Sequence, residues 1–91
     1  MDTKIHKTVE IVNAKGLHAR AAAKLCAVIE KFNCHVLISK GALEVLGCSI
    51  MGLLMLAAKQ GSSVTLKATG PESEEALKAA CQLIENGFDE N

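Results

Sequence analysis

Two hydrophobic periods alternate along this chain, and their order limits the folds open to it. Apolar residues recur at every second position in residues 5–12, 34–40 and 63–69, which is the period of a strand with one buried face. They recur at three- and four-residue intervals in residues 18–32 and 72–84, which is the period of an amphipathic helix. Because the two kinds of segment are interleaved, we expect an α+β fold in which helices cover a sheet.

Turn and capping residues supply the remaining boundaries. Lys40-Gly41-Ala42 predicts a turn that joins the preceding strand to a short strand over residues 43–46, so the two form a hairpin. Ser49 is a favourable N-cap for an apolar helix of two to three turns that Gly61 would end. Gly70-Pro71 ends the last strand. The predicted order is β-α-β-β-α-β-α, with one antiparallel or mixed sheet and the helices on one face.

Length and composition exclude several classes of protein. Ninety-one residues suffice for one hydrophobic core, so we expect a single domain over residues 1–91, and 49% apolar with 22% charged residues argues against disorder. Ten basic residues offset ten acidic ones, and two Phe are the only aromatic side chains besides histidine, so nucleic acid is an unfavourable partner. Residues 1–4 show no signal-peptide pattern, and the apolar run 50–58 is about half a membrane span, which predicts a cytoplasmic protein without membrane insertion.

The four cysteines, at positions 26, 34, 48 and 81, contain no Cys-x-x-Cys pair. We interpret them as reduced thiols that serve as small core residues. Cys34 and His35 are adjacent and point to opposite faces of a strand, so we expect no metal site and no cofactor. A redox or metal-binding domain is a third functional hypothesis, and it requires two of these cysteines, or a cysteine and a histidine, to converge in the fold.

The segment Gly16-Leu17-His18-Ala19-Arg20 lies where the first strand passes to the first helix. His18 takes the N-cap position, where Ser, Thr, Asp or Asn is usual, and a helix N-terminus offers free N–H groups to an anion. Arg20 can direct a planar guanidinium at the same anion, and Gly16 permits a tight turn. A neutral imidazole is also a nucleophile near physiological pH. The pattern suits phosphoryl transfer, and the alternative is an ordinary turn histidine with a solvated arginine.

Two strings resemble one known family. GLHARAAAKL closely resembles the active-site signature of HPr proteins of the phosphoenolpyruvate-dependent phosphotransferase system, and CSIMGLLMLAAKQGSSVTL is similar to the regulatory-serine segment and following strand of that family. The resemblance covers about residues 5–88, and LMLAAKQG is similar to the nitrogen-related branch. It implies an HPr-like open-faced β-sandwich, with a four-stranded sheet and three helices on one face.

The resemblance also implies a function. His18 would accept a phosphoryl group on Nδ1 from enzyme I and donate it to an enzyme IIA protein or domain, and Arg20 would assist as the second catalytic residue. Gly16, Ala19 and Arg20 would hold the phosphoryl group together with His18. Such a carrier is a co-substrate more than an independent enzyme, and it would serve sugar transport or regulation of nitrogen and carbon use. Nothing in the sequence requires more than a monomer.

Ser49 matches the serine that an ATP-dependent HPr kinase phosphorylates in many members of the family. A phosphate there would add about −1.5 to −2 charges at a helix start. The second hypothesis is therefore a regulatory binding module that Ser49 controls, with vestigial transfer at His18. Ala21 stands where the family commonly has Pro, and Cys48 where it often has Lys. Ala21 should leave the helix intact and loosen the turn before it, whereas the missing cation at Cys48 bears on kinase recognition and partner preference.

The apolar helix after Ser49 is the expected docking surface for enzyme I and enzyme IIA, as the resemblance implies. If Ile50, Leu53, Leu54 and Ala57 face the core, the side with Met51, Met55 and Ala58 would be exposed, and the alternative is a wholly buried helix. The docking residues that we expect are Leu17, Lys24, Ile50, Met51, Leu54 and Met55. Asp89, Glu90 and Asn91 are expected to form a frayed, solvated tail.

Overall fold

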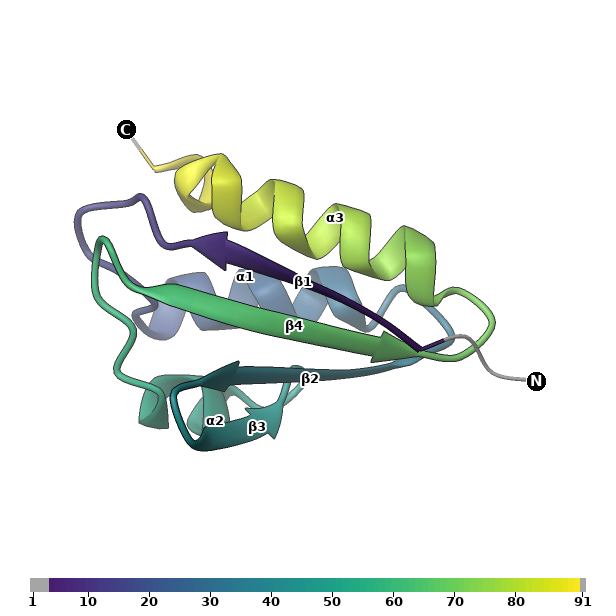
Figure 1. The fold of residues 1–91 in the computed structure, drawn as a ribbon. Coiled ribbons are helices and arrows are strands. Elements are labelled where there is room, and N and C mark those ends of the chain that lie inside the picture. Colours follow the sequence, from purple (N-terminus) through teal and green to yellow (C-terminus); the bar gives the residue numbers. More distant parts are fainter. Residues whose placement is uncertain (1–3, 91) are drawn as a thin grey trace.

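The structure is a computed structural model that describes residues 4–90, and Figure 1 shows its elements. In chain order these are β1 (Lys4–Glu10), α1 (Ala19–Ile29), β2 (His35–Lys40), β3 (Leu43–Leu46), α2 (Ile50–Met55), β4 (Ser63–Thr69), α3 (Ser73–Glu85) and the 3₁₀ helix η1 (Gly87–Asp89). The predicted order of strands and helices is confirmed, and η1 is added to it.

The four strands form one antiparallel sheet in the order β1-β4-β2-β3. The register sets Val9 opposite Val64, and both side chains are buried on the same face of the sheet. The other face carries polar pairs, such as Thr8 and Thr65, whose hydroxyl oxygens are 2.9 Å apart. One face is therefore covered and the other is solvated, as the alternating pattern predicts.

The helices pack over the buried face (Figure 1). α3 contacts β1 and β4 and also packs against α1, while α2 contacts α1 and β3. The apolar stripes predicted for the two longer helices are both buried. They are Ala22, Leu25, Cys26 and Ile29 in α1, and Leu77, Ala80, Cys81 and Ile84 in α3. The core between sheet and helices is mostly aliphatic, with the two thiols Cys26 and Cys81 and the fully buried ring of Phe88.

α2 is shorter than the sequence predicts. It ends at Met55, and the chain leaves the helical direction at Ala57, whose φ of 50° is left-handed. Gly61, expected to end the helix, instead lies in the turn before β4, where its N–H donates to the Ile11 carbonyl at 2.7 Å. The prediction that Gly61 stops α2 is wrong because the left-handed turn comes four residues earlier.

The orientation of α2 also differs from the expected one. Of the four residues considered as a core-facing side, only Leu53 is buried, whereas Ile50, Leu54 and Ala57 are exposed. Ala58 is buried although it was expected to line the exposed side. The early end of the helix explains the positions of Ala57 and Ala58, because a helical face cannot be extrapolated beyond Leu56. Ile50 and Leu54 lie within α2, on the sides that turn away from the buried Leu53.

The cysteines divide into two groups. Cys26 and Cys81 are buried, as interpreted, whereas Cys34 is half-buried and Cys48 is exposed, so the interpretation of Cys48 as a core residue is wrong. Burial raises the pKa of the Cys81 thiol, which keeps it protonated and unreactive. Within residues 4–90, no three His, Cys, Asp or Glu side chains are placed to share a metal ion. None of the helices in this part of the chain is long and apolar enough to cross a membrane.

Candidate functional site

His18 is the N-cap of α1, as the sequence predicts. Its backbone is extended, with φ −85° and ψ 179°, and its carbonyl accepts the first intrahelical bond from the Ala22 N–H at 2.8 Å. The imidazole makes no hydrogen bond to the helix amides. The first-turn N–H groups therefore have no side-chain cap and are available to an anion beside the ring. The ring itself is 26% exposed, so it is both held and accessible.

The turn before His18 depends on Gly16. Its φ is +66°, and a Cβ built there would lie 2.5 Å from the Ala58 carbonyl oxygen. The same carbonyl accepts a hydrogen bond from the Leu17 N–H at 2.9 Å, which joins the turn to the segment after α2. Leu17 is only 6% exposed, so its side chain packs in the core and offers almost no surface for docking. The expectation that Leu17 contacts partners needs this correction.

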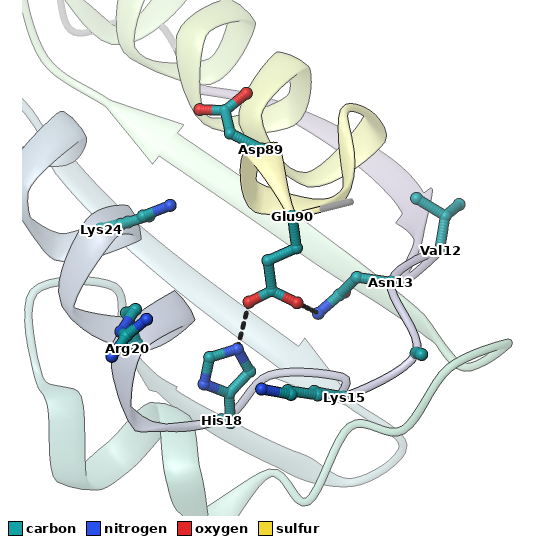
Figure 2. A pocket seen from close by; sticks show the side chains of 9 residues that line it. Val12, Asn13, Lys15, His18, Arg20, Lys24, Asp89 and Glu90 are labelled. Carbon is teal, nitrogen blue, oxygen red and sulfur yellow. Dashed lines mark hydrogen bonds and ion pairs between the residues drawn. The ribbon is translucent and has the colours of Figure 1, made fainter.

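A pocket of about 700 Å³ lies beside His18 (Figure 2). The loop before α1, the start of α1 and residues 89–90 line it, and its charged side chains are Lys15, Arg20, Lys24, Asp89 and Glu90. His18 and Arg20 thus share one pocket, as predicted. Gly16 and Ala19 lie within two residues of His18 in the chain but do not line the pocket themselves. Lys15 was not among the predicted site residues.

Glu90 is the functional candidate that sequence reasoning missed. Its Oε2 is hydrogen-bonded to Nε2 of His18, and its Oε1 accepts a bond from Asn13 Nδ2 at 3.0 Å (Figure 2). The bond from His18 first, and then the bond from Asn13, lower the pKa of the Glu90 carboxyl below its ordinary value. The prediction of a solvated tail is therefore wrong for Glu90, although Asp89 is exposed and Asn91 lies outside the described residues.

Phe88 and Asn13 hold Glu90 in place. Phe88 is fully buried with a left-handed φ of 56°, and its carbonyl accepts a hydrogen bond from Lys24 Nζ at 2.8 Å. Asn13 is 6% exposed, and its Nδ2 also donates to the Gly16 carbonyl at 2.8 Å, which ties Glu90 to the turn before His18. The sequence does contain one signal that this tail is packed against the fold: Phe88 follows the last predicted helix, and an aromatic ring is seldom left in a solvated tail.

The remaining predicted residues lie on α2, outside this pocket. Ser49 is the N-cap of α2, and its Oγ accepts a hydrogen bond from the Gly52 N–H at 3.0 Å, so the predicted capping role is confirmed. The four docking residues expected on this helix all have apolar side chains that are exposed to solvent. They are Ile50, Met51, Leu54 and Met55, with Met51 at 72% the most exposed.

Comparison with known proteins places these features in a family. The family model of the PTS HPr component phosphorylation site matches residues 5–86. Phosphocarrier protein NPr of Escherichia coli strain K12 is 41% identical over 88 residues, which is 96% of this chain and 98% of that protein. Phosphocarrier protein HPr of Cupriavidus necator is 44% identical over 86 residues, covering 94% of this chain and 97% of its own length.

A solved structure agrees with these relatives. HPr-C-His from Thermoanaerobacter tengcongensis has a TM-score of 0.91 and 41% identity, with 96% of this chain and 98% of that chain covered. The presence of NPr proteins among the relatives supports the NPr branch. The chain therefore belongs to the HPr family of phosphocarrier proteins of the phosphotransferase system.

Proposed function

We propose that this protein accepts a phosphoryl group from phospho-enzyme I on His18 and passes it to an enzyme IIA protein or domain. The observation that carries the proposal is the place of His18, half-exposed at the uncapped N-terminus of α1 and beside a pocket with the cations Lys15, Arg20 and Lys24. A phosphoryl group on the ring would meet positive charge and free N–H groups together.

The acceptor atom is Nδ1 of His18, because Nε2 is engaged with Glu90. In the transfer, the Nδ1 lone pair forms the new N–P bond while the N–P bond of the donor breaks and its electron pair stays with the donor nitrogen. The guanidinium of Arg20 and the backbone N–H groups from Ala19 onward stabilise the charge on the phosphoryl oxygens, and Gly16 supplies the turn that sets the ring there. The protein acts as a co-substrate, without a cofactor.

The exposed face of α2 is the proposed docking surface for both partners. Ile50, Met51, Leu54 and Met55 present adjacent apolar side chains to solvent, and flexible methionines adapt to more than one partner. Lys24, whose ammonium also bonds the Phe88 carbonyl, would contribute at the pocket side. We propose that the protein binds these partners as a cytoplasmic monomer.

Labelling with enzyme I tests the phosphocarrier proposal. Incubation with enzyme I and labelled phosphoenolpyruvate should give an acid-labile, base-stable label in the wild type and none in His18→Ala. His6→Ala is the matched control, because His6 is exposed on β1 and does not line the pocket. If a competent enzyme I left the wild type unlabelled, or if His18→Ala kept the label, the proposal would fail.

Ser49 favours a second, regulatory role. Its half-buried hydroxyl caps α2 at the edge of the exposed apolar side chains, so a phosphate there would place negative charge on the docking surface. An HPr kinase with ATP should label the wild type but not Ser49→Ala, and the modified protein should accept phosphoryl groups from enzyme I more slowly. If the wild type took no label from a competent enzyme I while the kinase still modified Ser49, the protein would be a regulatory binding module and not a carrier.

A further inference from the structure

We propose that Glu90 is a positioning residue for phosphotransfer, which keeps a proton on Nε2 of His18 and so keeps the lone pair of Nδ1 free for phosphorus. This inference rests on the proposed role of His18 as the phosphoryl acceptor. It adds a residue that the active-site string does not contain, because Glu90 lies 72 positions away from His18 in the sequence.

The hydrogen bonds of Glu90 assign the proton. Each carboxylate oxygen has one partner, Nε2 of His18 for Oε2 and Nδ2 of Asn13 for Oε1. The amide of Asn13 is a donor, and an ionised carboxylate can only accept. The lowered pKa of Glu90 agrees with an ionised carboxylate, so the hydrogen between Oε2 and Nε2 belongs to the ring. A neutral imidazole with its proton on Nε2 has its lone pair on Nδ1.

The carboxylate is held from both sides of the pocket. The Asn13 side chain donates both to the Glu90 carboxylate and to the Gly16 carbonyl. It therefore joins the carboxylate that orients the imidazole to the turn that carries His18. Phe88, two residues before Glu90, is fully buried, and its carbonyl is bonded by Lys24 from α1. A carboxylate fixed in this way orients a histidine at small entropic cost.

The other charged groups around the ring do not duplicate this role. The cations of the pocket cannot accept a hydrogen bond from the Nε2–H of His18, because they carry only donors; they are Lys15, Arg20 and Lys24. Asp89 also lines the pocket, but its side chain is exposed, and within residues 4–90 Glu90 is the carboxylate that is bonded to His18. In Figure 2 the second ring nitrogen points away from Glu90.

The charge balance of the transfer step gives the Glu90 carboxylate a second effect on His18. When the N–P bond forms at Nδ1 and the donor N–P bond breaks, the ring keeps its Nε2 proton and gains positive character. The Glu90 carboxylate offsets that charge from the opposite side of the ring, and no proton has to move in either direction. Loss of the carboxylate charge should therefore slow the acceptance of a phosphoryl group by His18.

Replacement of Glu90 by glutamine tests the inference, with Glu85→Gln as the control. Glu85 lies at the end of α3, is half-exposed and forms a surface ion pair with Lys7, so its replacement removes the same charge away from the pocket. Ring ¹⁵N NMR at a pH where the histidines are neutral should show the Nε2–H form of His18 in the wild type and in Glu85→Gln. In Glu90→Gln the His18 shifts should approach those of the exposed His6 and His35.

The rate of labelling by enzyme I supplies the second readout. Glu90→Gln should be labelled about tenfold more slowly than the wild type, to the same final stoichiometry, while Glu85→Gln keeps the wild-type rate. Unchanged ring shifts in Glu90→Gln, or equal rates in the two variants, would overturn the positioning role. The ring spectrum does not depend on transfer, so failure of the carrier proposal appears separately, as a wild type that takes no label.

Discussion

The replacement of Gly16 by alanine tests how tightly the turn before His18 is built. Gly16 has a φ of +66°, and left-handed backbone costs an L-residue roughly 1–2 kcal/mol. The new Cβ would also lie 2.5 Å from the Ala58 carbonyl oxygen and 3.1 Å from the Lys59 Cα. Both neighbours are backbone atoms that cannot rotate away, so the two segments must separate.

Separation of the segments weakens the hydrogen bond from the Leu17 N–H to the Ala58 carbonyl, now 2.9 Å, which contributes about 0.5–1.5 kcal/mol. The smaller entropy of the unfolded alanine variant returns about 0.4–1 kcal/mol. The expected net loss for Gly16→Ala is therefore about 2 kcal/mol in the free energy of unfolding.

Gly41→Ala is the matched control, because Gly41 has a φ of +60° but nothing lies within 4 Å of its added Cβ. Its free energy of unfolding should fall only by the cost of the left-handed backbone, which is about 1 kcal/mol or less after the same entropy correction. Urea unfolding followed by far-ultraviolet circular dichroism measures both losses, since the chain has no Trp or Tyr to report by fluorescence. Equal losses in the two variants would refute the close contact with Ala58.

Three further predictions follow from single side chains. Ser49→Ala should lower the free energy of unfolding by about 1 kcal/mol, because the bond from the Gly52 N–H is lost, and urea unfolding measures it. In the native protein an aromatic disulfide reagent should modify the exposed Cys48 first and the buried Cys81 only on unfolding, and protection of Cys48 would contradict its placement. Because the pKa of Glu90 is lowered from its ordinary value of 4.5, its ionised carboxylate stabilises the folded state above about pH 4.5, and this stabilisation is lost as the pH falls further. The free energy of unfolding should therefore decrease less at acid pH in Glu90→Gln than in the wild type.

The element order could be predicted from the sequence because each long element has a clear period. β4 alternates buried residues with more accessible ones from Ser63 to Thr69, and α3 places its apolar stripe on one face, so local pattern and tertiary packing agree. α2 could not be predicted in the same way. A nearly all-apolar run has no polar face to fix its orientation, and the left-handed Ala57 that ends it carries no sequence signal.

The candidate site was predictable only where its residues are close in sequence. His18 caps α1 and Arg20 lies in its first turn, so their positions follow from the helix start alone. Asn13 and Glu90 are in contact because η1 returns the chain to the start of α1. A contact between two polar residues 77 positions apart has no periodic pattern in the sequence by which it could be predicted. Polar contacts of this kind depend on tertiary geometry and not on propensity.

The charge of the pocket is set locally, although the whole chain has a formal net charge of zero. Lys15, Arg20 and Lys24 face Asp89 and Glu90, which leaves one excess positive charge at the ring. A bound phosphoryl group carries about −1.5 to −2 charges, so these side chains and the group would together carry about −0.5 to −1, which the positive character of the phosphorylated ring offsets. A carrier has to release its group as readily as it accepts it, and a pocket with all three cations unopposed would hold the group too tightly. The two carboxylates therefore suit transfer in both directions better than storage.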